Sequence, residues 1–158
     1  MGKFAVFSGF LGSGKTTTMM ALTKYFTVHH GKAAMISNDL GQQSLADNKL
    51  ANLAGCNASE LTGECICYQT ENLVERLDNL FDQDGCELVI SDIPGFGVGA
   101  LEHVYHTLHK KYPGRFRLAP FTVLVCRKAG IVTKSKTRHL LTSPGFLLWC
   151  LREWKGQV

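Results

Sequence analysis

One short segment near the N-terminus limits what this chain can fold into more than any other feature. Residues 9–17 read Gly-Phe-Leu-Gly-Ser-Gly-Lys-Thr-Thr, which satisfies the pattern G-x-x-x-x-G-K-S/T, and they follow the apolar run 4–7 directly. Glycines allow the tight turn that brings backbone N–H groups close to phosphate oxygens, and a helix beginning here points its positive dipole end at the same anion. The segment therefore predicts a phosphate-binding loop between a strand and a helix, in a chain that binds a nucleoside triphosphate.

The positions of this loop have expected roles. Lys15 should contact the β- and γ-phosphates as a catalytic residue, and the Thr16 hydroxyl should ligate Mg²⁺. A glycine-rich turn with an unrelated lysine is the alternative, but the strand before the motif and the helix after it argue against that. The full set expected to contact the nucleotide is Gly9, Gly12, Ser13, Gly14, Lys15, Thr16, Thr17 and, in a later loop, Gly95.

Composition narrows the class of protein. The chain has 158 residues, enough for one domain, with 45% apolar and 19% charged residues as in an ordinary globular protein. A net charge of +4 with scattered basic residues predicts no nucleic-acid partner, and no run approaches the ~20 apolar residues of a membrane span. Six cysteines in a nucleotide-binding chain indicate a reducing compartment, and the first strand leaves no room for a signal peptide. We therefore expect a cytoplasmic protein.

Strand and helix patterns alternate along the chain. This alternation implies right-handed crossovers, a mainly parallel sheet and a three-layer α/β domain of the P-loop NTPase class over residues 1–126. We expect residues 127–158 to form a divergent C-terminal extension of a domain that is truncated at this end. The expected strands are 3–8, 33–37, 87–91 and 121–126, and the expected helices are 15–29, 71–81 and 100–111.

A second part of the nucleotide site is expected on another strand. The apolar run 88–91 ends in Asp92-Ile93-Pro94-Gly95, a D-x-x-G sequence. In phosphate-loop enzymes a carboxylate here holds the Mg²⁺ shell, and the glycine N–H senses the γ-phosphate; a plain turn is the alternative. Asp39, after the second strand, is a further candidate for the Mg²⁺ or for orienting the attacking water. Because ligands bind at the carboxyl ends of parallel strands, these residues should share one edge of the sheet.

With these motifs in this order, the chain resembles the CobW-type metallochaperone GTPases, relatives of the nickel-insertion GTPases for hydrogenase and urease. Residues 9–17 are similar to the family's phosphate loop, and Asn38-Asp39-Leu40-Gly41 is similar to its Asn-Glu-Phe-Gly segment. Residues 60–68, Glu-Leu-Thr-Gly-Glu-Cys-Ile-Cys-Tyr, resemble its Glu-Leu-x-Asn-Gly-Cys-Ile-Cys-Cys metal motif. The resemblance covers about residues 1–126. It implies slow GTP hydrolysis and delivery of a transition metal or a cobalamin-type metallocofactor to a metalloprotein client.

The chain departs from this family in its metal motif. Tyr68 replaces the third cysteine, which leaves Cys65 and Cys67 as thiolate ligands for Zn²⁺ or another transition metal. Cys56 or Glu64 could complete such a site. The alternative is a pair of reduced cysteines packed against the core.

The chain also departs from this family in the segment that would recognise the nucleotide base. Guanine recognition usually needs Asn/Ser/Thr-Lys-x-Asp, whereas residues 133–136 end in lysine, a donor where an acceptor is required. The preference for GTP is therefore implied by the resemblance and not by the residues.

Three functions remain open at this point. The first is a Mg²⁺-dependent, GTP-binding and GTP-hydrolysing switch in metal or metallocofactor delivery, slow until a partner or a second copy of the chain completes the site. The second is an ATP-dependent, kinase-like enzyme acting on a small molecule, for which Arg115 and Arg117 hint at a lid. The third is a regulatory module that binds a nucleotide without hydrolysing it.

Overall fold

The computed structural model describes residues 1–10, 12–38, 52, 57–61, 65–93 and 99–124. No described helix is both long enough and apolar enough to cross a bilayer. The strands are β1 (Gly2–Gly9), β2 (Ala33–Ser37), β3 (Asn57–Glu60), β4 (Leu88–Asp92), β5 (Phe116–Leu118) and β6 (Thr122–Leu124). The helices are α1 (Lys15–His29), α3 (Thr70–Asp78) with the π-helical segment η1 (Asn79–Gln83), and the π-helical segment η2 (Ala100–His106) with α4 (Thr107–Lys111).

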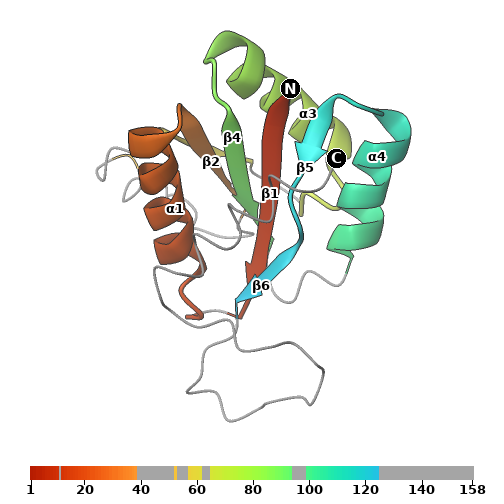
Figure 1. The fold of residues 1–158 in the computed structure, drawn as a ribbon. Helices are drawn as coiled ribbons and strands as arrows, with labels where there is room; N and C mark the ends of the chain where they lie inside the picture. Colours follow the sequence, from red (N-terminus) through yellow and green to blue (C-terminus); the bar gives the residue numbers. More distant parts are fainter. Residues whose placement is uncertain (11, 39–51, 53–56, 62–64, 94–98, 125–158) are drawn as a thin grey trace.

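The strand pairs of the described sheet are all parallel. The order is β3-β2-β4-β1-β5, and β6 pairs with β1 beyond the end of β5 (Figure 1). β1 and β4 pair in a register that sets Phe7 opposite Asp92, so the carboxyl ends of these neighbouring strands coincide. Parallel strands are covered on both faces, which is why β1, β2 and β4 are nearly continuous buried runs.

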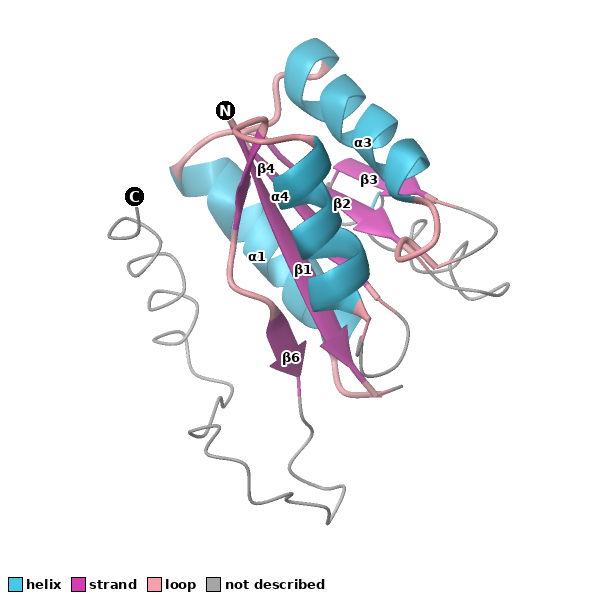
Figure 2. Ribbon diagram, turned by 90° about the vertical axis from the view of Figure 1, so that its right-hand side faces the viewer, coloured by secondary structure: helices cyan, strands magenta, loops and turns pink. Residues whose placement is uncertain are grey.

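Helices cover both faces of this sheet, and successive strand residues serve different layers. Phe4 and Val6 belong to the core formed with α3, η2 and α4, whereas Ala5 and Phe7 belong to the core formed with α1. Figure 2 shows α1 and α4 on opposite sides of β1. The period of two in a strand produces this division. The expected three-layer α/β architecture with a parallel sheet is confirmed.

Most predicted elements are present, but the sequence pattern misses two strands. The predicted helix 71–81 is α3 continued by η1, and the predicted helix 100–111 is η2 continued by α4. β3 was not predicted because Asn-Ala-Ser-Glu has little β propensity; its pairing comes from the backbone of β2. β5 has only three residues, too few for a pattern. Residues 125 and 126 of the predicted last strand, and the whole of 127–158, lie outside the described part.

A half-buried tyrosine fills the interruption between β5 and β6. Pro120 lies between these strands and has no N–H to donate, so the ladder with β1 breaks there. The main-chain N of Val6 donates instead to the Tyr105 hydroxyl of η2 at 3.3 Å, and the Tyr105 ring meets Phe121 edge-on. Burial raises the pKa of Tyr105, so its hydroxyl stays neutral. The helix layer is thus tied to the strand that leads into residues 9–17.

Candidate nucleotide and metal site

The predicted nucleotide-site residues that the structure describes come from elements that meet at the carboxyl edge of the sheet. β1 runs directly into the loop that starts α1, and the neighbouring β4 ends at Asp92. The main-chain N of Ile93 donates to the carbonyl oxygen of Phe7 at 2.9 Å, which holds the chain after Asp92 against β1. Asp39 and Gly95 lie outside the described residues, so their roles stay predictions.

The loop between β1 and α1 has a backbone that favours glycine. φ is +149° at Gly9, +77° at Gly12 and +88° at Gly14, which caps the N-terminus of α1. A Cβ on Gly9 would collide with the carbonyl oxygen of Leu124 and lie 2.7 Å from Ser13 Oγ. The tight turn that the motif predicts is therefore present, and β6 packs directly against its start.

Donors that suit an anion are concentrated in this loop. The Lys15 ammonium donates to the carbonyl oxygens of Gly9 at 2.8 Å and Phe10 at 3.2 Å, so it lies over the loop. Ser13 Oγ is buried and has no hydrogen-bond partner among the described residues. The first turn of α1 carries no acidic side chain that would repel a phosphate. An ammonium, an unpaired hydroxyl and a helix N-terminus together fit the oxygens of a nucleoside triphosphate.

Oxygen ligands that suit Mg²⁺ come from the two neighbouring elements. Thr16 is half-buried in the first turn of α1, whereas Thr17 is exposed. Asp92 is 9% exposed, and its Oδ1 accepts a hydrogen bond from the main-chain N of Asn38 at 2.7 Å. A hydroxyl and a carboxylate are hard oxygen donors of the kind that Mg²⁺ prefers, so the donor set fits this ion.

The two cysteines of the metal motif flank a buried anchor. Cys65 and Cys67 are half-buried on either side of Ile66, which is fully buried. The main-chain N of Tyr68 donates to the carbonyl oxygen of Cys65 at 2.8 Å and closes a turn. Burial first, then a hydrogen bond and charge interaction with Cys65, raise the pKa of Cys67 to about 12. The Cys67 thiol is therefore protonated at neutral pH, and a metal ion that binds it must release its proton.

The described residues do not complete a metal site. Within them, no cluster of three or more His, Cys, Asp or Glu side chains could hold a metal ion. Tyr68 is 75% exposed and its ring stacks on that of His103, with centroids 6.2 Å apart. Cys56 and Glu64, the residues expected to complete the site, lie outside the described part. A metal ion at the thiol pair needs further ligands from outside the described residues.

Two comparisons with known proteins bear on this arrangement. The model of the CobW/HypB/UreG nucleotide-binding domain matches residues 3–139. The chain belongs to this family. The predicted resemblance is confirmed, and both the phosphate loop and the thiol pair lie inside the matched range.

A zinc chaperone is similar in sequence to part of this CobW/HypB/UreG domain. The zinc chaperone YjiA of Escherichia coli (strain K12) is 37% identical over 79 residues, which is 46% of this chain and 24% of the relative. The match thus spans about a quarter of the length of that relative.

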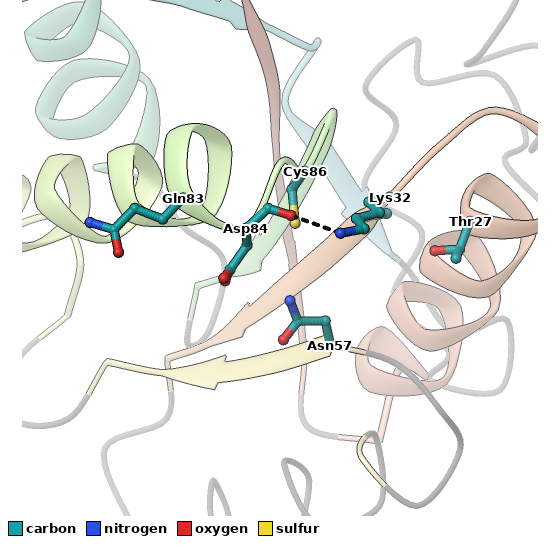
Figure 3. A pocket seen from close by; sticks show the side chains of 7 residues that line it. Thr27, Lys32, Asn57, Gln83, Asp84 and Cys86 are labelled. Atoms are coloured by element: carbon teal, nitrogen blue, oxygen red, sulfur yellow. Dashed lines mark hydrogen bonds between the residues drawn. The ribbon is translucent and has the colours of Figure 1, made fainter.

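A cavity lies at the opposite edge of the same domain, where the strands begin (Figure 3). Its volume is about 380 Å³, and the Lys32 ammonium donates to the carbonyl oxygen of Asp84 at 3.2 Å beside it. Cys86 is 6% exposed and burial is the main cause that raises its pKa, so its thiol is a core group. The lining residues are Thr27, Lys32, Ala33, Asn57, Gln83, Asp84 and Cys86. The length of the sheet separates this cavity from the phosphate loop.

Sequence reasoning missed the role of Asn38 in this CobW/HypB/UreG domain. The residue is 1% exposed and contacts both Asp92 and Ile66. Its place in the segment 38–41 was the available signal. Its partners are 54 and 28 residues away along the chain, a separation that no local pattern reveals.

Proposed function

We propose that this chain is a Mg²⁺-dependent, GTP-binding and GTP-hydrolysing switch in transition-metal delivery. Zn²⁺ is the first cargo to test, and a cobalamin-type metallocofactor is the second cargo that the proposal includes. The observation that carries the proposal is the pairing of β1 with β4, which brings the phosphate loop and Asp92 to the same edge of the sheet. Membership of a nucleotide-binding family supports the nucleotide, and similarity to a zinc chaperone supports the metal.

The residues of the chain divide the nucleotide chemistry between them. Loop N–H groups and the Lys15 ammonium hold the negative charge of the β- and γ-phosphates. Thr16 and Asp92 would hold Mg²⁺, which would neutralise part of the charge on the phosphates. Asp39 orients the attacking water, and the Gly95 N–H senses the γ-phosphate. A partner protein or a second copy of the chain completes the site, so the isolated chain hydrolyses GTP slowly.

The metal ion is cargo in this proposal, and a site that the described residues leave incomplete suits cargo. A closed zinc site takes four protein ligands, whereas the thiol pair Cys65 and Cys67 supplies two. An ion held this way keeps open positions that a metalloprotein client can fill with its own ligands. Exchange of ligands then moves the ion without first freeing it into solution.

The two arginines that hinted at a lid argue against the kinase-like alternative. Arg115 forms a bidentate pair with Asp78, with Nε–Oδ1 and Nη2–Oδ2 distances of 3.0 and 2.6 Å. Arg117 lies opposite Lys3, near the start of β1. Both arginines are therefore at the edge of the sheet away from the phosphate loop, where neither covers a bound phosphate.

Calorimetry with GTP and ATP in Mg²⁺, each with and without Zn²⁺, tests the proposed function. We expect GTP to bind at least about tenfold more tightly than ATP, and Zn²⁺ to change the rate of GTP hydrolysis. Cys86→Ser, which removes a thiol outside the motif, should respond to Zn²⁺ as the native chain does. Equal affinity for both nucleotides with no effect of Zn²⁺ on turnover would contradict the proposal. Tight GTP binding without any hydrolysis would favour the regulatory module.

A further inference from the structure

Asn38 is the residue at which the two halves of the candidate site meet. It directly follows β2 and is 1% exposed. Its main-chain N donates to Asp92 Oδ1 at 2.7 Å, and its side-chain Oδ1 accepts from the main-chain N of Ile66 at 3.0 Å. One buried residue therefore contacts both the carboxylate at the end of β4 and the backbone between the two cysteines.

The Asn38 side chain holds the neighbouring segment at a second point. Its Nδ2 donates to the carbonyl oxygen of Leu61 at 3.3 Å, and the main-chain N of Leu61 donates to the carbonyl oxygen of Ser37 at 3.1 Å. The Asn38 amide offers both an acceptor and a donor to this segment; a carboxylate lacks the donor and an aliphatic chain lacks both. Because these groups are buried, each lost partner leaves a polar group unpaired.

Ile66 makes the connection to the thiols stiff. Its side chain is fully buried in the core that also holds Ile36 and Val89, whereas Cys65 and Cys67 on either side are half-buried. Close packing leaves little free space around such a residue. A displacement of the Asn38 side chain would therefore act on Ile66 together with the two cysteines next to it, because the three residues are consecutive in the chain.

We infer that Asn38 is a positioning residue that couples nucleotide binding to metal binding, an inference that rests on the proposed function. Mg²⁺ held at Asp92 would alter the hydrogen bond that Asp92 accepts from the Asn38 main chain, and the Asn38 side chain would pass this change to the segment with Cys65 and Cys67. Coupling is a free energy shared by two sites, so each ligand must change the affinity of the other by the same factor.

Co²⁺ binding, followed by its thiolate charge-transfer absorption, measures this coupling. In the native chain, a non-hydrolysable GTP analogue with Mg²⁺ should change Co²⁺ affinity by about 5- to 150-fold. In Asn38→Ala, which loses both side-chain hydrogen bonds, that factor should fall to about one, and in Asn38→Asp it should fall part of the way. Nucleotide affinity without Co²⁺ should stay within about threefold of native, since the Asn38 main chain and Asp92 are unchanged.

Two control variants separate coupling from general damage. Thr23→Val removes a buried hydroxyl of α1 that has no partner among the described residues, and it should leave the coupling factor at its native value. Cys86→Ser should leave the Co²⁺ absorption unchanged, which excludes the Cys86 thiol as the source of that signal. If the Asn38 variants keep the native factor, or if the native chain binds both ligands without coupling, the inference is overturned and the proposed function stands. A native chain that binds neither ligand defeats the proposed function itself.

Hydrogen exchange tests the same connection without any variant. The Ile66 amide should be strongly protected, because it is buried and bonded to Asn38. Adding nucleotide should change its exchange rate by about tenfold or more, and should change the rate of the Tyr68 amide, which bonds within its own turn to Cys65, by less. An Ile66 amide that exchanges equally fast with and without nucleotide would overturn the inference.

Discussion

The phosphate loop and the thiol pair are both short motifs of one domain, but they differ in how much of their chemistry is local. In the loop, Lys15 contacts carbonyl groups five and six residues away, and the glycine conformations are set by the loop itself. The thiol pair depends on Asn38, which is 28 residues from Ile66, and the described residues do not complete its ligand set. A motif whose contacts are local can be interpreted from sequence. A motif whose contacts come from other strands can be interpreted only when the fold is known.

The largest effect should come from removing the single charge of the local motif. Lys15→Ala should lower nucleotide affinity by at least about a thousandfold, roughly 4 kcal/mol, because the loop loses its charge-assisted contacts to phosphate. Calorimetry with GTP measures this, and Lys24→Ala, exposed on the same helix, should bind as the native chain does. Nucleotide affinity that survives in Lys15→Ala would show that the loop does not hold the phosphates.

The next effect should fall on the thiol pair and leave the phosphate loop intact. Ile66→Ala should lower the free energy of unfolding by about 3 kcal/mol, because it opens a cavity in the core beneath the thiol pair. Denaturant unfolding measures that loss, and Co²⁺ titration should show weakened binding while GTP affinity stays within about threefold. A larger loss of GTP affinity than of Co²⁺ affinity would contradict the division into a local loop and a supported thiol pair.

A smaller effect should come from the tyrosine that supports β1, the strand that leads into the phosphate loop. Tyr105→Phe keeps the ring but leaves the main-chain N of Val6 without its hydroxyl partner, so the free energy of unfolding should fall by about 1–2 kcal/mol. Thermal and denaturant unfolding check this value. Tyr25→Phe, which changes a half-buried tyrosine on α1, is the matched control and should change stability by less than about 0.5 kcal/mol. Equal losses in the two variants would show that the hydrogen bond between Val6 and the Tyr105 hydroxyl does not stabilise the fold.

The smallest effect at neutral pH should come from Cys67, because its titration is confined to alkaline pH. The pKa of Cys67 rises from 9.0 to about 12 in the folded chain, so the folded state keeps a proton that the unfolded state loses. Its contribution to stability is complete below pH 9 and is lost as pH rises toward 12. Cys67→Ser should therefore flatten the decline in unfolding free energy over this range, while Cys65→Ala, which removes the neighbour's charge and hydrogen bond, should shift it. An identical decline in native and Cys67→Ser chains would contradict the raised pKa.

The same distinction explains which elements were predictable. The apolar runs of β1, β2 and β4 are buried on both faces and therefore stand out in the sequence. β3 is polar and pairs through its backbone, so its residues carry no strand pattern. The phosphate-loop residues are contiguous and could be named in advance, and their roles stay predictions, as do those of Asp39 and Gly95. Asn38 and Tyr105 could not be identified, because each acts through hydrogen bonds to main-chain groups of distant segments.

By itself, the sequence of this protein determined a phosphate-binding loop between a strand and a helix, in an α/β domain with a parallel sheet. Glycine conformations, apolar periodicity and helix starts are local properties, and they follow from neighbouring residues alone. Only the tertiary structure decided that β1 lies beside β4, that a tyrosine hydroxyl fills the broken sheet edge, and that one asparagine joins Asp92 to the thiol pair. Those contacts join segments far apart in the chain, and the buried polar groups that make them satisfy one another only once the core has closed.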